Sequence, residues 1–252
     1  MNIDTWKANA KAQKGVLVVW VDQSTDSALK AINSNGVCFA MARDFTLSFQ
    51  AGGTAPFYFI NGIRDADVAS GGTNRIPAKY IADQQLYKAE NASYNNTVKV
   101  LRAESKTATK EGKAAILKQL KDILQAWRGI WYGKTMKSFD EATEDIIISA
   151  FDDFLYPKMD TLVQQNGPSY FIVSMSKKGG GHAIAFGLRP DLSTDTFSGI
   201  YEYFDANLGS FTFPTFQNLK DFFDTNVLSL YIDYSKFTMA SFVATNNDRH
   251  IP

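Results

Sequence analysis

Apolar residues follow two different periods along this chain, and the change falls near Pro168. Between residues 79 and 131 they recur every three or four positions, most clearly over 114–127, which predicts helices with one buried face. After Pro168 they lie in short alternating or continuous runs, which predict strands. Helices followed by a set of antiparallel strands indicate an α+β fold.

Local signals predict further elements. The β-branched run 16–21 predicts a buried strand, and the glycines and prolines of 51–77 predict a loop-rich connection. Ser138 and Glu141 have the spacing of a capping box, which predicts that a helix begins here, with Ile147 and Phe151 on its apolar face. Strands are expected at 170–175, from His182 onward, at 200–205 and at 209–213, then a helix at 216–224 and one or two strands between 228 and 243.

The chain has a single cysteine, Cys38, at the start of a predicted helix. Turn-forming residues 33–36 precede it, and apolar residues follow it. In the first turn of a helix, free N–H groups and the helix dipole favour the thiolate, which lowers the pKa of a thiol from about 8.5. Cys38 is therefore a candidate nucleophile, with a simple buried hydrophobic role as the alternative.

A catalytic thiolate needs an imidazole, and the chain has two histidines. His182 follows three glycines and opens a predicted strand, whereas His250 lies in the polar C-terminal segment and is expected to be frayed. The next predicted strand ends at Asp205, so a hairpin would bring this carboxylate to the second ring nitrogen of His182 and fix its tautomer. A core role for His182 and an Asx turn at Asp205 are the alternatives.

The three residues stand in the stretches Gly36-Val37-Cys38, Gly181–Ala185 and Tyr203–Phe211. Together these stretches resemble the YopT-like cysteine proteases of bacterial effectors, which have a papain-like fold. The resemblance spans roughly residues 33 to 211 and is most specific in the Phe-Asp-x-Asn-x-Gly run that contains Asp205. It implies one papain-like catalytic domain over 1–252, in which the nucleophile helix of a mainly helical half (1–160) packs on an antiparallel sheet half (168–252).

The resemblance also implies an activity. It indicates a cysteine endopeptidase, a thiol hydrolase that cuts a host or other target protein through a catalytic triad of Cys38, His182 and Asp205, and that also processes itself. An amide side chain in the oxyanion hole is implied as well, with Asn33 as the first candidate and Asn35 as the competing one. Helix capping explains Asn33 nearly as well, and the long intervals between the motifs leave the substrate open.

Two other functions use the same residues. The triad could act on a glutamine side chain, which would make the chain a papain-like deamidase or transglutaminase. A catalytically inactive papain-like module would instead only bind partners.

Charge and composition narrow the partners. The chain has 26 basic and 26 acidic residues, so its overall charge gives no argument for binding nucleic acid. One cysteine and two distant histidines argue against a structural metal site, and neither a metal nor a cofactor is expected. Between Arg75 and Lys137, thirteen basic residues face five acidic ones. This excess is interpreted as a solvated helical face, with contact to anionic lipid or to an acidic partner as the alternative.

The N-terminal sequence has no basic-then-apolar signal pattern, and no run approaches about 18 apolar residues. We therefore expect synthesis in the bacterial cytoplasm without a cleaved signal peptide. The resemblance to effectors implies secretion or translocation into a target cell, and the protein is expected to be a monomer.

Overall fold

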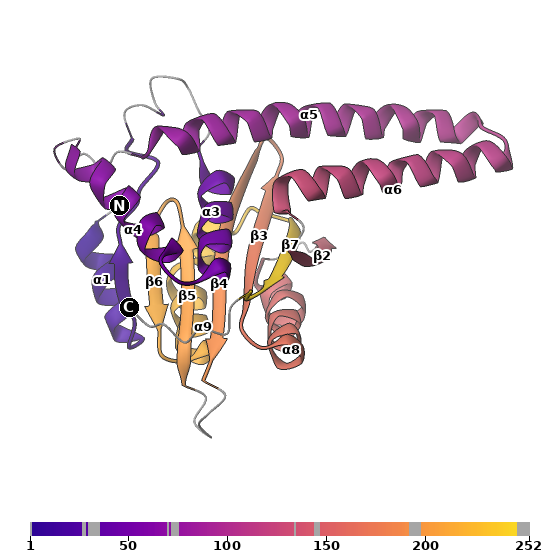
Figure 1. The fold of residues 1–252 in the computed structure, drawn as a ribbon. Helices are drawn as coiled ribbons and strands as arrows, with labels where there is room; N and C mark the ends of the chain where they lie inside the picture. Colours follow the sequence, from indigo (N-terminus) through magenta and orange to yellow (C-terminus); the bar gives the residue numbers. More distant parts are fainter. Residues whose placement is uncertain are drawn as a thin grey trace.

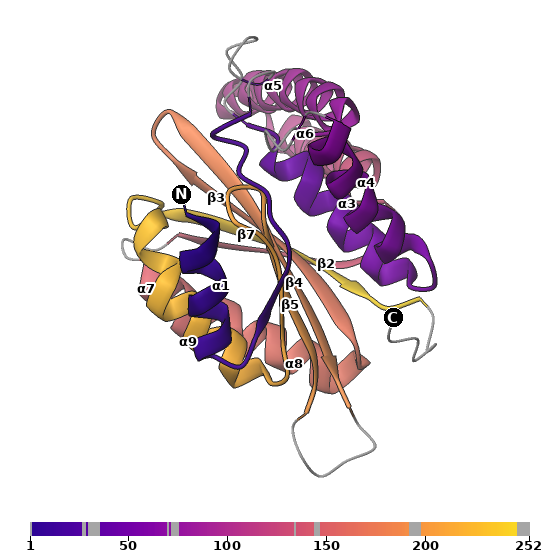
Figure 2. The ribbon, with the colours of Figure 1, turned by 90° about the vertical axis from the view of Figure 1, so that its left-hand side faces the viewer.

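The structure, a computed structural model, describes residues 2–26, 29, 36–69, 71, 76–133, 135–143, 147–191 and 198–245. Within these ranges the chain forms a seven-stranded antiparallel sheet in the order β1-β6-β5-β4-β3-β7-β2. Helices cover both faces of the sheet, so the molecule has three layers (Figures 1 and 2). The mixed helix and antiparallel-sheet class agrees with the α+β prediction.

The strands are β1 (Val16–Val19), β2 (Met136–Thr143), β3 (Ser169–Lys177), β4 (Gly180–Pro190), β5 (Gly199–Asp205), β6 (Gly209–Phe213) and β7 (Lys236–Val243). The helices are α1 (Ile3–Ala12), α3 (Cys38–Ala51), α4 (Ala55–Ala69), α5 (Ala78–Thr107), α6 (Lys110–Tyr132), α7 (Ile147–Ser149), α8 (Tyr156–Asn166) and α9 (Phe216–Asn226). A π-helical turn, η1 (Ala150–Leu155), and a 3₁₀ turn, η2 (Leu228–Tyr231), complete the described elements.

Alternation along the strands gives the sheet two apolar faces. In β4, Ala183 and Ala185 contribute to the core beneath α3 and α4, whereas Ile184 and Phe186 contribute to the core beneath α1, α8 and α9. Figure 2 shows these two groups of helices on opposite sides of the sheet. Helix α3 lies against β3 and β4, so the helix that begins with Cys38 packs directly on the sheet.

Two predictions made from the sequence are wrong. The stretch 51–77, expected to be loop-rich, contains the 15-residue helix α4, in which Pro56 occupies the first turn, where its missing N–H costs little. Ser138 and Glu141 do not begin a helix but lie in β2, and the Ser138 hydroxyl hydrogen-bonds that of Ser241 on β7 at 2.6 Å. Because β2 is an edge strand, its polar residues stay near solvent, and the apolar alternation typical of inner strands is absent.

Gly209 allows β6 to approach β1 closely. Its φ is 101°, and a Cβ atom at this position would lie 2.1 Å from the carbonyl oxygen of Val19. Gly167, which follows α8, also has a positive φ, of 77°, but no atom of the described residues lies within 4 Å of its Cβ position. Any other residue at either position would therefore have a strained backbone, and at Gly209 its Cβ atom would also clash with β1.

We predict that Gly167→Ala lowers the free energy of unfolding by about 1 kcal/mol through backbone strain. Gly209→Ala is expected to lower it by about 2 kcal/mol more, because β1 must move away from β6. Chemical denaturation of both variants measures the difference. Equal losses would contradict the close approach of the two strands.

Candidate active site

Cys38 is the first residue of α3, and its side chain is buried. The N-cap residue of this helix, Val37, makes no side-chain capping hydrogen bond; instead, two glutamines accept hydrogen bonds from N–H groups at the start of the helix. Gln23 Oε1 lies 2.7 Å from the Val37 nitrogen, and Gln84 Oε1 of α5 lies 3.0 Å from the Ala40 nitrogen. The first N–H groups of a helix have no acceptor within the helix, so these two contacts fix where α3 begins.

The hairpin of β4 and β5 joins His182 to Asp205. Ile184 lies opposite Asp205 in the antiparallel register, and Nε2 of His182 is 2.9 Å from Oδ1 of Asp205. An ionised carboxylate can only accept a hydrogen bond, so Nε2 carries the proton and the other ring nitrogen, Nδ1, is left for Cys38. The sequence expectation that a hairpin brings these two side chains together agrees with this geometry.

Asp205 has no exposed surface, and four groups donate hydrogen bonds to its carboxylate. Besides His182, the donors are the backbone N–H of Asn207 and the hydroxyls of Tyr203 and Tyr231. Burial alone would raise the pKa of this carboxyl, but the His182 charge and the hydrogen bonds outweigh burial and lower the pKa below its usual value. Asp205 therefore stays ionised.

The thiol of Cys38 and the imidazole of His182 shift each other's pKa. Burial alone would raise the pKa of Cys38, but the charge of His182, a hydrogen bond from its ring and another from the Ala183 backbone bring it below the ordinary value. Burial alone would lower the pKa of His182, yet the charges of Asp205 and Cys38 raise it to about 10. A thiolate beside an imidazolium is the favoured state between the two values.

Tyr231 is a residue of this site that sequence reasoning missed. Its ring stacks on the His182 ring, with centroids 4.8 Å apart and an interplanar angle of 19°, and its hydroxyl oxygen lies 3.0 Å from Nε2. Because its single hydroxyl proton goes to Asp205, that oxygen can accept from Nε2 and from the side-chain amide of Asn207, which is 3.2 Å away. Tyr231 lies in η2, at the start of a segment expected to form strands, and no sequence pattern distinguishes it.

Gln23 is the second missed residue, and it links the residue before Cys38 to the turn after Asp205. While its Oε1 accepts from Val37, its Nε2 donates to Asn207 Oδ1 at 2.8 Å, and its backbone N–H donates to the Ala206 carbonyl at 2.9 Å. The residue before Cys38 is thus tied to the turn after Asp205. Glutamines in polar segments are common, so the sequence carries no signal for this link.

Three other residues considered in the sequence are not described by the structure. Asn33 and Asn35, the candidates for the oxyanion hole, and His250 lie outside the described residues. Among the residues that are described, no group of three or more His, Cys, Asp or Glu side chains is placed to hold a metal ion.

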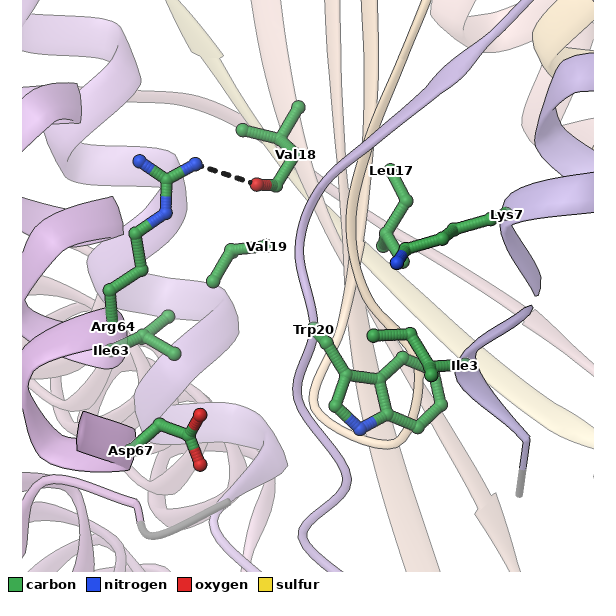
Figure 3. Close-up of a pocket in the computed structure, with 9 residues that line it drawn as sticks. All are labelled: Ile3, Lys7, Leu17, Val18, Val19, Trp20, Ile63, Arg64 and Asp67. Carbon is green, nitrogen blue, oxygen red and sulfur yellow. Dashed lines mark hydrogen bonds between the residues drawn. The ribbon is translucent and has the colours of Figure 1, made fainter. Parts of the chain in front are cut away.

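A cavity of about 210 Å³ lies away from these residues, beside the edge strand β1 (Figure 3). Side chains of α1, β1 and α4 line it, and Arg64 of α4 donates to the carbonyl oxygen of Val18 at 2.8 Å (Figure 3). Cys38, His182 and Asp205 do not contribute to its lining, so this cavity is not the candidate active site.

Two phenylalanine substitutions separate the roles of the Asp205 donors. Tyr203→Phe and Tyr231→Phe each remove one hydroxyl from Asp205, and each is expected to lower the free energy of unfolding by about 1–3 kcal/mol. Only the Tyr231 hydroxyl also contacts His182. We therefore predict that Tyr231→Phe raises the pKa of the Cys38 thiol by about half a unit more than Tyr203→Phe does. The ultraviolet absorbance of the thiolate across pH measures this, and identical curves would contradict the role given to Tyr231.

Comparisons with known proteins give little further information about the chain. No protein-family model and no curated protein matches its sequence. Among solved structures, the chain is similar to the Pseudomonas avirulence protein AvrPphB, with 13% sequence identity and a TM-score of 0.38. The likeness covers 83% of this chain and 93% of that one. At this TM-score it assigns neither a fold family nor an activity to this chain.

Proposed function

We propose that this chain is a papain-like cysteine protease in which Cys38 is the nucleophile, His182 the acid and base, and Asp205 the group that positions His182. The observation that carries the proposal is a buried thiol hydrogen-bonded to an imidazole, which in turn is held by a fully hydrogen-bonded carboxylate. A cysteine that only fills a core needs none of these partners, and burial alone would keep it neutral. A thiol pKa lowered by a specific partner is typical of a nucleophile.

The proposed reaction starts from the thiolate–imidazolium pair. The Cys38 sulfur attacks the carbonyl carbon of a peptide bond, a C–S bond forms, and the carbonyl oxygen becomes an oxyanion. His182 then gives its proton to the amide nitrogen, the C–N bond breaks, and a thioester remains. Neutral His182 next takes a proton from water, whose oxygen attacks the thioester and releases the acid product and the thiolate.

The oxyanion needs donors near the Cys38 sulfur. The backbone N–H of Cys38 belongs to the first turn of α3, where no acceptor within the helix is available. The N–H groups of Val37 and Ala40 are already bound to Gln23 and Gln84, so the Cys38 N–H is the natural first donor. We propose the carboxamide of Asn33 as the second donor, as the family resemblance implies.

The resemblance to YopT-like effectors supports a protein substrate in a target cell, reached by secretion or translocation. Cys38→Ala removes the nucleophile, and His182→Ala removes the acid and base. We predict that incubating the wild-type chain with a eukaryotic lysate creates new protein N-termini, and that both variants create none. Labelling of N-termini followed by mass spectrometry measures this.

Other outcomes of that experiment would contradict a protease. The same new N-termini with Cys38→Ala would assign the cleavage to a contaminant. Proteins that gain about one dalton at glutamine without any cleavage would favour the deamidase that uses the same triad. Absence of any change that depends on Cys38 would favour the inactive binding module.

The two shifted pKa values predict the pH dependence of hydrolysis. Activity should fall on the acid side as the thiolate is protonated, with a midpoint below the ordinary thiol pKa because His182 lowers the pKa of Cys38. On the alkaline side it should fall as His182 loses the proton that the leaving amine needs, near the raised pKa of about 10. Initial rates of cleavage of an identified substrate across pH measure both limbs. An acid limb centred at or above the ordinary thiol pKa would contradict the ion pair.

A further inference from the structure

Helices α5 and α6 form an antiparallel pair, the helical arm, that extends well beyond the sheet (Figure 1). Aromatic contacts join the two helices along the part nearest the sheet, where Tyr94 stacks on Trp127 with centroids 5.0 Å apart. The rest of the arm is largely exposed, and most of the basic excess of this part of the chain lies on it. None of the described helices is long and apolar enough to cross a membrane.

Basic and acidic residues lie on different sides of the arm. In both helices, basic residues come directly after positions that turn towards the partner helix: Lys99 follows Val98, Arg102 follows the buried Leu101, and Lys121 follows Leu120. In each helix, a residue is rotated by about 100° around the helix axis from the residue before it. Because the two helices run antiparallel and face each other, residues that directly follow the inward-turning positions lie on the same side of the arm in both helices. The resulting basic face consists of Lys88, Lys99, Arg102 and Lys106 of α5 and Lys110, Lys113 and Lys121 of α6, all exposed.

The acidic residues of the arm lie on the other side. Glu104, Glu111 and Asp122 each come directly before an inward-turning position, which rotates them away from the basic face. No ion pair within the described residues involves a member of the basic face. The whole chain carries no net charge, so a strong positive field would come from this face and not from the molecule as a whole.

We propose that the basic face of the arm docks on an anionic phospholipid surface. Six of its seven cations are lysines, which act as point charges suited to a diffuse anionic plane and lack the planar fork of arginine that recognises a shaped group. The face is elongated, since Lys88 and Lys106 are 18 positions apart in α5 and the helix rises about 27 Å between them. Leu117, which is 64% exposed, follows the inward-turning Ile116 and therefore lies among these lysines, where its side chain can enter the interface between headgroups and acyl chains.

The base of the arm is joined to the candidate active site. Gln84 accepts from the Ala40 N–H, and Tyr87 stacks on Phe39 with centroids 3.9 Å apart, so α5 is fixed to the turn of α3 that carries Cys38. An arm lying on a membrane would therefore hold this turn in one orientation to the surface. The proposed membrane contact does not depend on the proposed protease activity. Only the idea that the contact presents membrane-bound substrates to Cys38 rests on that activity.

Co-sedimentation with lipid vesicles tests the proposal. The wild-type chain is expected to bind vesicles of phosphatidylcholine with about one third phosphatidylserine, to bind less tightly as salt rises, and to ignore pure phosphatidylcholine. The triple substitution Lys99→Gln, Lys106→Gln and Lys113→Gln should weaken binding about 100-fold, since each lysine near such a surface contributes about fivefold. A matched control, Lys11→Gln, Lys178→Gln and Lys236→Gln, removes the same charge from exposed sites outside the arm and should bind like the wild type.

Three outcomes would overturn the proposal. They are no binding of the wild type to phosphatidylserine vesicles at physiological salt, equal losses in the arm and control variants, and tighter binding to a DNA duplex or to polyglutamate than to the vesicles. Cys38→Ala should bind vesicles like the wild type, which keeps this test independent of the proposed protease. Circular dichroism of each variant verifies that the arm remains helical.

Discussion

A carboxylate without exposed surface organises one end of the sheet. An ionised Asp205 in such a place is stable only with an opposite charge and several donors around it. These donors come from β4 through His182, from β5 through Tyr203, from the turn through Asn207, and from η2 through Tyr231. Loss of any one leaves a buried negative charge short of partners, so these segments are held in a single arrangement.

Cys38 lies on the opposite face of the sheet from two of the Asp205 donors. It belongs to the core beneath α3 and α4, whereas Tyr203 and Tyr231 belong to the core on the opposite face. Gln23 links the two, because one amide side chain binds both the residue before Cys38 and the turn after Asp205. Gln84 of the helical arm accepts a hydrogen bond from Ala40, in the first turn of α3, which also contains Cys38. The geometry of the candidate nucleophile thus depends on two neutral side chains as much as on the charged ones.

The sequence predicted most strands of the sheet but not the edge strand β2. Strands β3 to β6 and helix α9 were predictable because their buried faces impose a clear period, and the β4–β5 hairpin follows from Asp205 ending the strand after His182. Edge strand β2 was mistaken for a helix because its polar residues also fit a capping box. Gln23 and Tyr231 could not be found, since their roles arise from contacts across 14 and 49 residues that local patterns do not carry.

The pH dependence of Cys38 alkylation tests most directly whether His182 makes this buried thiol a thiolate. Iodoacetamide reacts with the thiolate, so the reaction of the wild type should have its midpoint below the ordinary thiol pKa. In His182→Ala, burial and the Asp205 charge raise the thiol pKa and only the Ala183 hydrogen bond opposes them, so the reaction should move to a clearly higher pH. The same pH dependence in both proteins, centred at or above the ordinary thiol pKa, would contradict the account.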